Sequence, residues 1–325
     1  MIGTDRPVIA VLTGDQHPPD MEPIEAAAVV RYTRQEGLSE ALRGADALFV
    51  YDFLSRALRH SWYAADRLRW VHAASAGVDP MLFPELQASD VVLTNSRGVF
   101  DDSIAEYVLG TVLAFAKDFA TSLDLQRQVR WLHRESERIA GRRVLVVGTG
   151  PIGRAIARML RAVGMRVSAL GRRAREHDPD FGTVSPSAEL PRHLPDADYV
   201  VIVAPLTEQT KGMFDAAAFA AMKPGARLVN VGRGELVVTS DLIEALRAGR
   251  LAGAALDVFD TEPLPPDSPL WTLPGVLVSP HMSGDFAGWR NTLVEVFADN
   301  FQRWQTGQPL RNVVDKQLGY VPSGD

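Results

Sequence analysis

The chain has 325 residues, of which 46% are hydrophobic, so it is long enough for two cored domains and too long for one typical domain. Its formal net charge of −6 argues against nucleic acid or anionic lipid as a partner, and no apolar stretch approaches the roughly 18 residues of a membrane span. Because cysteine is absent, disulfides, thiolate catalysis and thiolate metal sites are excluded, which fits a reducing compartment. The polar amino terminus and the lack of a membrane span lead us to expect a cytoplasmic protein, and we expect no metal centre.

Short β-rich runs alternate along the chain with amphipathic or alanine-rich segments, a pattern typical of parallel sheets covered by crossover helices. The first series of expected strands covers residues 8–12, 47–51, 69–73 and 91–94. The second series covers residues 144–147, 166–170, 199–203, 227–231, 251–258 and 276–279. Two series predict two sheets, and therefore an α/β protein of two domains.

Between the two series, residues 101–133 contain few helix breakers and carry apolar side chains at helical spacing. We expect a linking helix followed by an arm, and an apolar face on an arm usually needs a partner. A homodimer is the resulting hypothesis. After the last strand, a helical stretch at about 285–306 can return the chain to the first domain. The expected domains are residues 1–98 plus 286–325, and residues 99–285.

The first strand of the second series runs into glycines at the G-x-G-x-x-G spacing, Gly148, Gly150 and Gly153, followed by a helical segment. Glycine permits the tight turn, the close approach of backbone to a pyrophosphate and the packing of helix on strand, and a helix amino terminus attracts phosphate. Pro151 suits the first helical position, where its missing N–H costs nothing. Alone the spacing is a weak signal. Between a strand and a helix it predicts dinucleotide binding over a purely structural turn.

The strand after this helix ends without the acidic residue that would hold the ribose hydroxyls of NAD. Gly171, Arg172 and Arg173 stand there, with Arg175 close behind. A guanidinium can grip a 2′-phosphate by charge-assisted hydrogen bonds, and no carboxylate is placed to repel that phosphate. We therefore expect NADP(H) as the preferred cofactor, with NAD(H) as the alternative. The competing interpretation of these arginines is a solvated turn.

Three later strands of the second series each lead into a polar residue that can do chemistry, namely Arg233, Glu262 and His281. In an open α/β sheet, ligands bind outside the carboxyl ends of the strands, so we expect these residues in one crevice. Reduction of a 2-keto acid requires groups of these kinds: an anion-binding guanidinium, a carboxylate and an imidazole. Taken singly, each of the first two is typical of an ordinary surface turn, and only their shared position at strand ends favours a site.

These segments resemble the D-2-hydroxyacid dehydrogenases, and among them the NADP-linked glyoxylate/hydroxypyruvate (2-ketoacid) reductases. The similarity extends in the family's order over residues 74–79, 95–106, 148–153, 204–210, 231–235, 256–263 and 279–281. It implies a Rossmann doubly wound parallel sheet and a smaller flavodoxin-like α/β substrate domain. The implied reaction transfers hydride from NADPH to the keto carbon of a small 2-keto acid such as glyoxylate or hydroxypyruvate, giving the D-2-hydroxy acid reversibly.

The resemblance implies a role for each member of the trio. Arg233 would hold the substrate carboxylate and polarise the keto oxygen, with flanking glycines that let substrate and cofactor approach the backbone. His281 would protonate the ketone oxygen, and would act as the base in the reverse direction. Glu262 would bond the far ring nitrogen of His281 and fix its tautomer. Asp257 would accept a hydrogen bond from the nicotinamide amide.

Further contacts follow from the same resemblance. The backbone N–H groups of Ala76 and Gly77 would cradle the substrate carboxylate from the side opposite Arg233, and Tyr51 would line the pocket. The remaining cofactor contacts would be Ile152, Pro205, Val231, Ser103 and Thr210. The hydroxyls of the last two could equally cap their own backbone segments.

Departures from related patterns narrow the alternatives. Phosphoglycerate dehydrogenases often carry a regulatory domain for which no length remains, and formate dehydrogenases have glutamine where Glu262 stands. C-terminal-binding corepressors share the fold as nucleotide-sensitive scaffolds and can retain the trio, but the missing acidic ribose ligand and the lack of long tails favour a reductase. An NAD-linked dehydrogenase of a bulkier D-2-hydroxy acid is the other alternative. The sequence names neither the physiological substrate nor the direction of flux.

Overall fold

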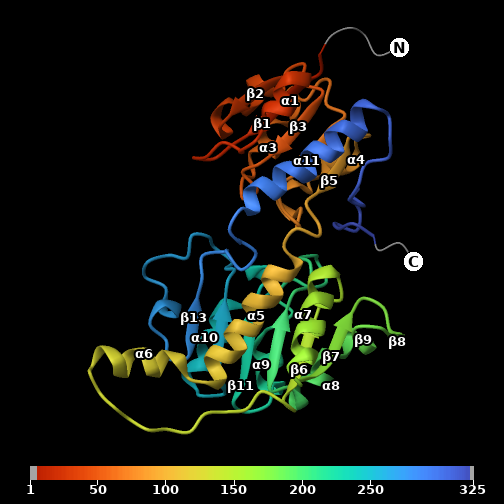
Figure 1. Ribbon diagram of the computed structural model, residues 1–325. Helices are drawn as coiled ribbons and strands as arrows, with labels where there is room; N and C mark the ends of the chain where they lie inside the picture. Colours follow the sequence, from red (N-terminus) through yellow and green to blue (C-terminus); the bar gives the residue numbers. More distant parts are fainter. Residues whose placement is uncertain (1–5, 323–325) are drawn as a thin grey trace. The chain divides into compact units, whose positions relative to one another are not determined.

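The computed structural model describes residues 6–322 of the chain. The chain divides into two compact units, Met1–Val99 with Phe286–Asp325, and Phe100–Asp285 (Figure 1). Each unit has its own sheet, with helices packed on it. All ten expected strands are present, with ends that differ from the expectation by no more than two residues. The predicted α/β class is confirmed.

The larger unit contains an eight-stranded sheet in the order β13-β12-β11-β10-β6-β7-β9-β8. Every neighbouring pair is parallel except β8 with β9. The strand order reverses at β6, which lies between β7 and β10, so the sheet is doubly wound in the Rossmann manner and its switch point lies beside β6. The strands are β6 (Arg143–Val147), β7 (Arg166–Gly171), β8 (Arg175–Asp178), β9 (Gly182–Pro186), β10 (Tyr199–Ile202), β11 (Ala226–Asn230), β12 (Leu251–Leu256) and β13 (Val276–Val278).

Helices cover both faces of this sheet (Figure 1). In β6, Val144 and Val146 pack into the core that includes α5 and α7, while Leu145 and Val147 pack into the core that includes α9 and α10. A strand buried on both faces reads as a continuous apolar run, which is why β6 is recognisable in the sequence. The helices of this unit are α5 (Asp101–Ala116), α6 (Phe119–Arg127), α7 (Pro151–Ala162), α8 (Leu190–His193), α9 (Ala216–Ala221) and α10 (Thr239–Arg247).

The smaller unit contains a five-stranded, all-parallel sheet in the order β2-β1-β3-β4-β5, which is the flavodoxin-like order. Its strands are β1 (Val8–Leu12), β2 (Val29–Thr33), β3 (Ala47–Val50), β4 (Trp70–Ala73) and β5 (Val92–Asn95). Its helices are α1 (Glu22–Ala27), α2 (Leu38–Leu42), α3 (Ala57–Ser61), α4 (Pro84–Ala88) and α11 (Trp289–Gln305).

Helix α11 joins this unit through an aromatic stack. The ring of Phe297 lies parallel to that of Phe49, with centroids 4.1 Å apart. It is also stacked on the ring of Trp70, with centroids 5.2 Å apart. Burial of such large side chains is among the strongest contributions to a core. The stack therefore ties the last long helix of the chain to strands β3 and β4.

His72 in β4 is a fully buried imidazole beside this stack. Its Nδ1 lies 2.8 Å from Thr94 Oγ1, and its Nε2 lies 3.3 Å from Ser96 Oγ. Because burial disfavours the charged ring, the pKa of His72 is lowered from 6.5 to about 3. The ring is therefore neutral in the folded chain around neutral pH.

We expect acidification to destabilise the smaller unit through His72. In the unfolded chain His72 binds a proton below about pH 6.5, whereas in the folded chain it stays neutral down to about pH 3. The free energy of unfolding therefore falls by about 1.4 kcal/mol for each pH unit as the pH decreases through this window. Urea unfolding of wild type and His72→Gln, which does not titrate, measures the effect. The free energy of unfolding of wild type, minus that of His72→Gln, should decrease by about 2 kcal/mol from pH 7 to pH 5. Parallel pH profiles would contradict this origin.

Three elements differ from the sequence expectation or were absent from it. Strand β2 and the β8–β9 hairpin were not expected, because their partly exposed residues lack the apolar pattern of buried strands. The helical segment expected from residue 101 is broken at Asp118, which has a φ of 49° and caps α6 by accepting from the Thr121 N–H at 3.4 Å. Residues 130–139 have no regular secondary structure. Among residues 6–322, no helix is long and apolar enough to cross a bilayer.

Candidate functional site

The carboxyl end of β6 forms a glycine turn with space for a ligand. Gly148 has a φ of +121°, and a Cβ there would lie 2.6 Å from the Val203 carbonyl carbon. A Cβ on Gly153 would lie 2.1 Å from Gly148 O, whereas a Cβ on Gly150 would meet nothing within 4 Å. Two glycines therefore permit the turn and its packing, and the third leaves open space at the amino terminus of α7, where Pro151 begins the helix. This turn fits a dinucleotide pyrophosphate.

Beyond the turn, β7 ends at Gly171, and Arg172 and Arg173 follow as exposed residues. Arg175 does not share their setting. It lies in β8, and its Nε donates to Asp178 Oδ2 at 3.1 Å. Arg172 and Arg173 directly follow the strand end, and the contacts of all three arginines with a 2′-phosphate remain predictions.

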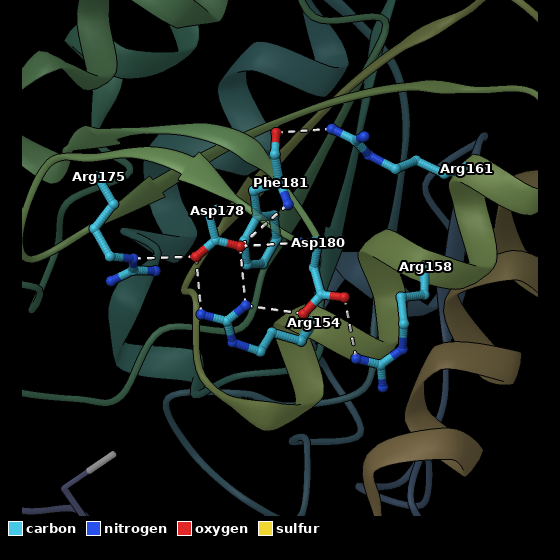
Figure 2. A network of polar contacts seen from close by, with 7 residues as sticks. All are labelled: Arg154, Arg158, Arg161, Arg175, Asp178, Asp180 and Phe181. Atoms are coloured by element: carbon cyan, nitrogen blue, oxygen red, sulfur yellow. Dashed lines mark hydrogen bonds and ion pairs between the residues drawn. The ribbon is translucent and has the colours of Figure 1, made fainter. Parts of the chain in front are cut away.

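Figure 2 shows an ionic network that joins the β8–β9 hairpin to helix α7, the helix that follows the glycine turn. Arg154, directly after Gly153, donates from Nη1 and Nη2 to the two oxygens of Asp178, both at 2.9 Å, and from Nη1 to Asp180 at 2.8 Å. Asp178 has a side chain only 3% exposed. Burial raises its pKa, but hydrogen bonds from Arg154, the Asp180 N–H and Arg175 outweigh burial and lower the pKa to about 2.

This carboxylate is therefore ionised and compensated within the chain. Two guanidinium groups contact it, those of Arg154 and Arg175. The network was not found from the sequence, because no periodic pattern links residues 24 positions apart.

The loop after β10 is closed by its own hydroxyl groups. Thr210 Oγ1 donates to Pro205 O at 2.7 Å and accepts from the Thr207 N–H at 2.8 Å. Val231, just beyond β11, is buried and donates its N–H to Ile202 O. Thr210 thus has the capping role that was its alternative, and any cofactor contacts of Pro205, Thr210, Val231 and the half-buried Ile152 remain predictions.

The turn that carries Arg233 is held by a side chain of β11. The amide of Asn230 accepts from the Gly232 N–H at 3.1 Å and donates to Arg233 O at 3.0 Å. A Cβ on Gly234 would lie 1.8 Å from the Phe259 carbonyl carbon. The space beside Gly234 is thus filled by the chain's own backbone, which corrects the interpretation that this glycine opens the backbone to a ligand.

His281 and Glu262 form a hydrogen-bonded pair. His281 Nδ1 lies 2.8 Å from Glu262 Oε2, and the other carboxylate oxygen accepts from the Phe259 N–H at 2.9 Å. The side chains are 26% and 23% exposed. Burial raises the pKa of Glu262, but these two hydrogen bonds, the electrostatic effect of His281 and the smaller effect of Arg233 bring it below its ordinary value. An ionised acceptor assigns the Nδ1 proton to the histidine, so Nε2 is the nitrogen for proton exchange.

Asp257 lies behind this pair and is fully buried. Its Oδ1 accepts from Ser279 Oγ at 2.5 Å and from the Met282 N–H at 2.9 Å, and its Oδ2 accepts from the Ser283 N–H at 2.9 Å. Ser103, expected as a cofactor contact, donates to Ser283 O at 3.3 Å. Both side chains therefore hold the turn around His281, and a nicotinamide contact of Asp257 remains a prediction.

The expected substrate contacts of the smaller unit follow its parallel strands. After β4, the Ala76 carbonyl accepts from Asn95 at 2.5 Å and the Gly77 carbonyl accepts from Ser75 at 2.6 Å, which fixes that loop. Tyr51 follows β3 and is buried. Burial raises its pKa against the opposing effect of Arg290. The roles of Ala76, Gly77 and Tyr51 toward substrate stay predictions.

The larger unit thus brings its predicted residues to one edge of its sheet. Glu262 and His281 are in contact, and the charge of Arg233 acts on Glu262. The three follow β11, β12 and β13, which are adjacent strands, and the glycine turn follows β6 in the same sheet. What the sequence missed is the support of the histidine turn by Tyr107 and Ser279, whose hydroxyls lie 2.7 Å apart.

Comparisons with known proteins agree with this geometry. A family profile described as D-isomer specific 2-hydroxyacid dehydrogenase, NAD binding domain, matches residues 109–283. A glyoxylate reductase from Thermococcus onnurineus is 32% identical over 295 residues, which is 87% of each chain. A D-isomer specific 2-hydroxyacid dehydrogenase family protein from Aeromonas salmonicida has a solved structure with a TM-score of 0.82 and 34% identity, covering 96% of this chain and 100% of that chain.

A second solved structure is that of the NADPH-dependent glyoxylate/hydroxypyruvate reductase from Sinorhizobium meliloti, in complex with NADP and sulfate. It has a TM-score of 0.82 and 29% identity, covering 96% of this chain and 99% of that chain. The profile covers more than half of this chain, and the Thermococcus relative is more than 30% identical over most of both chains. The chain therefore belongs to the D-isomer specific 2-hydroxyacid dehydrogenase family of oxidoreductases.

Proposed function

We propose that this protein is a cytoplasmic reductase that converts a small 2-keto acid, such as glyoxylate or hydroxypyruvate, into the D-2-hydroxy acid with NADP(H). The observation that carries the proposal is the 2.8 Å contact of His281 with Glu262 on strand ends adjacent to that of Arg233. A proton donor, its orienting carboxylate and an anion-binding cation are the groups that ketone reduction in a 2-keto acid requires.

Each side chain has a defined task in this reaction. Arg233 binds the carboxylate of the keto acid and draws electron density toward the keto oxygen. His281 gives the proton on Nε2 to that oxygen, while Glu262 accepts from Nδ1 and keeps the ring in one orientation. The dinucleotide supplies the hydride to the keto carbon when bound. In the reverse direction the same Nε2 accepts the hydroxyl proton.

The proposed substrate contacts of the smaller unit are the N–H groups of Ala76 and Gly77, with Tyr51 beside the substrate side chain. An NAD-linked dehydrogenase of a bulkier D-2-hydroxy acid uses the same trio, so the substrate itself must be identified by assay. NADPH oxidation should be followed with glyoxylate, hydroxypyruvate, pyruvate and longer 2-keto acids. Turnover of a short 2-keto acid supports the proposal. No turnover across the panel with either dinucleotide would instead favour a corepressor-like scaffold.

We further propose that NADP(H) is preferred over NAD(H), because Arg172 and Arg173 follow the strand where NAD enzymes have an acid. The double substitution Arg172→Ala, Arg173→Ala is expected to lower kcat/KM for NADPH by about 10- to 100-fold, the size of one or two charge-assisted hydrogen bonds. Activity with NADH should change little. The measurement is steady-state kinetics with both cofactors at a fixed keto acid.

Arg192→Ala is the matched control for this pair, because Arg192 is also exposed but lies on α8. It should leave both cofactor constants unchanged. A wild-type preference for NADH, or an equal loss with both cofactors in the double variant, would overturn the assignment.

A homodimer is proposed from the arm. Its apolar side chains form an exposed series, with Trp131 100% exposed. Large apolar side chains exposed along one short segment favour an interaction site, and a second copy of the chain presents the same segment. Sedimentation velocity at micromolar concentration should give a dimer, and Trp131→Asp should shift it toward monomer. Tyr63→Asp, at an exposed aromatic residue of the smaller unit, is the control. A monomeric wild type removes the proposal. The exposed series is Phe119, Leu123, Val129, Trp131 and Leu132.

A further inference from the structure

The backbone at His281 adopts a conformation that histidine rarely takes. Its φ is +52°, in the left-handed region where a side chain with a Cβ is crowded by the backbone. Such a conformation is strained and persists only where surrounding contacts over-determine it. The direction of the imidazole is therefore fixed by whatever holds the turn of residues 279–283.

The buried carboxylate of Asp257 is the centre of that turn. Its two oxygens accept from the Ser279 hydroxyl and from the Met282 and Ser283 N–H groups. The His281 N–H donates to the Asp257 backbone carbonyl at 2.8 Å. Four donors from one turn converge on this residue, and together they supply the contacts that the left-handed histidine needs.

Helix α5 holds both ends of the same turn. Tyr107 Oη lies 2.7 Å from Ser279 Oγ, and Ser103 Oγ donates to Ser283 O at 3.3 Å. Ser103 and Tyr107 are four residues apart, so they lie on one face of the helix, one turn from each other. The helix thus contacts the residues two before and two after His281.

The direction of the hydroxyl chain follows from the carboxylate. The Ser279 hydroxyl donates its proton to Asp257 Oδ1, which leaves the Tyr107 hydroxyl to donate to Ser279 Oγ. Hydrogen bonds aligned in a chain toward one buried acceptor strengthen one another. The relay runs in a single direction from the helix to the carboxylate.

We propose that Tyr107 and Ser279 are positioning residues for catalysis, because their relay to Asp257 fixes the turn that points the His281 imidazole at the reacting oxygen. This inference rests on the proposed function of His281. The partners of the two hydroxyls are each other and the Asp257 carboxylate. Their task is to keep the left-handed turn in one geometry, so that Nδ1 stays on Glu262 while Nε2 exchanges the proton.

The test uses Tyr107→Phe and Ser279→Ala in the full chain. Each should lower kcat by about 10-fold or more, the size of one hydrogen bond that acts on the transition state, while KM for keto acid and for NADPH stays within about 3-fold. The double variant should lose little more than Ser279→Ala alone, because both changes break one relay. Ser279→Thr, which keeps the hydroxyl, should restore most of the turnover.

Thr111→Val is the matched control. Thr111 is a buried hydroxyl residue on the same helix, but its Oγ1 donates to the Val108 carbonyl one turn earlier. This variant should retain wild-type kcat. Loss of turnover equal to that of Tyr107→Phe would mean that any damage to α5 has the same effect, and would overturn the relay.

A second readout is independent of turnover. The Nδ1 proton shared by His281 and Glu262 should give a downfield NMR resonance in wild type, which His281→Gln assigns by its disappearance. Tyr107→Phe and Ser279→Ala should shift or broaden this resonance, and Thr111→Val should not. If wild type turns over no keto acid but the resonance responds as stated, the proposed function fails and the relay stands. Unchanged kcat and an unchanged resonance, or unfolding of both variants, would refute the positioning role.

Discussion

His281→Gln is expected to lower kcat by about 10²- to 10⁴-fold, the usual contribution of a positioned general acid. Glutamine retains similar volume and can still bond Glu262, but it carries no proton that it can give up near neutral pH. The KM for the keto acid should change by less than about 5-fold, because carboxylate binding is assigned to Arg233. Steady-state NADPH oxidation with glyoxylate or hydroxypyruvate measures both constants.

Two variants frame this result. His60→Gln changes an exposed histidine of α3 and should leave kcat unchanged. Glu262→Gln keeps a hydrogen-bonding group next to Nδ1 but removes the charge. Its kcat should therefore lie between that of wild type and that of His281→Gln. Retention of more than about one tenth of the turnover by His281→Gln would show that another group supplies the proton.

The ionised carboxylate of Glu262 should stabilise the folded chain at neutral pH, and this contribution should be lost in acid. Its pKa lies below the ordinary value of 4.5, because two hydrogen bonds, the electrostatic effect of His281 and the smaller effect of Arg233 outweigh burial. The carboxylate therefore stays ionised as the pH falls toward 4.5, and the stability that it contributes is lost only below that value. Acid inactivation above about pH 5 must then arise elsewhere, for example in the buried His72.

The parts of the fold that the sequence predicted are those buried on both faces. Strands such as β6 and β10 are continuous apolar runs, and their ends were placed within one or two residues. Strand β2 and the β8–β9 hairpin could not be found in this way, since Arg175 and His177 in β8 are polar and partly exposed. Their stability comes from neighbours that are distant in sequence, and periodicity contains no information on such neighbours.

In the candidate site too, the residues that follow apolar strands were predicted and the others were not. Arg233, Glu262 and His281 were found because each follows a readable strand, and parallel strands place their carboxyl ends at one edge. The relay from Tyr107 could not be found, because a helix near residue 107 and a turn near residue 279 share no local pattern. Sequence likewise could not separate the glycine that opens toward a ligand, Gly150, from those that the backbone packing requires.

Arg233→Ala is expected to lower kcat/KM for the keto acid by about 10²- to 10⁴-fold, mainly through KM. The reason is that a carboxylate leaves water only if a cation with matching hydrogen bonds replaces its hydration. Arg233→Lys keeps the charge but not the planar pair of donors, so it should recover part of the loss. Initial rates over a wide range of keto acid concentration, at saturating NADPH, separate kcat from KM.

The same substitution has a second consequence that binding alone does not predict. The charge of Arg233 is one of the causes that lower the pKa of Glu262, so its removal should raise that pKa and move the acid limb of the kcat profile to higher pH. Arg247→Ala, at an exposed arginine of α10, should alter neither KM nor the profile. An unchanged KM in Arg233→Ala would place the substrate carboxylate on another group, while a raised KM with an unmoved acid limb would separate substrate binding from the Glu262–His281 pair.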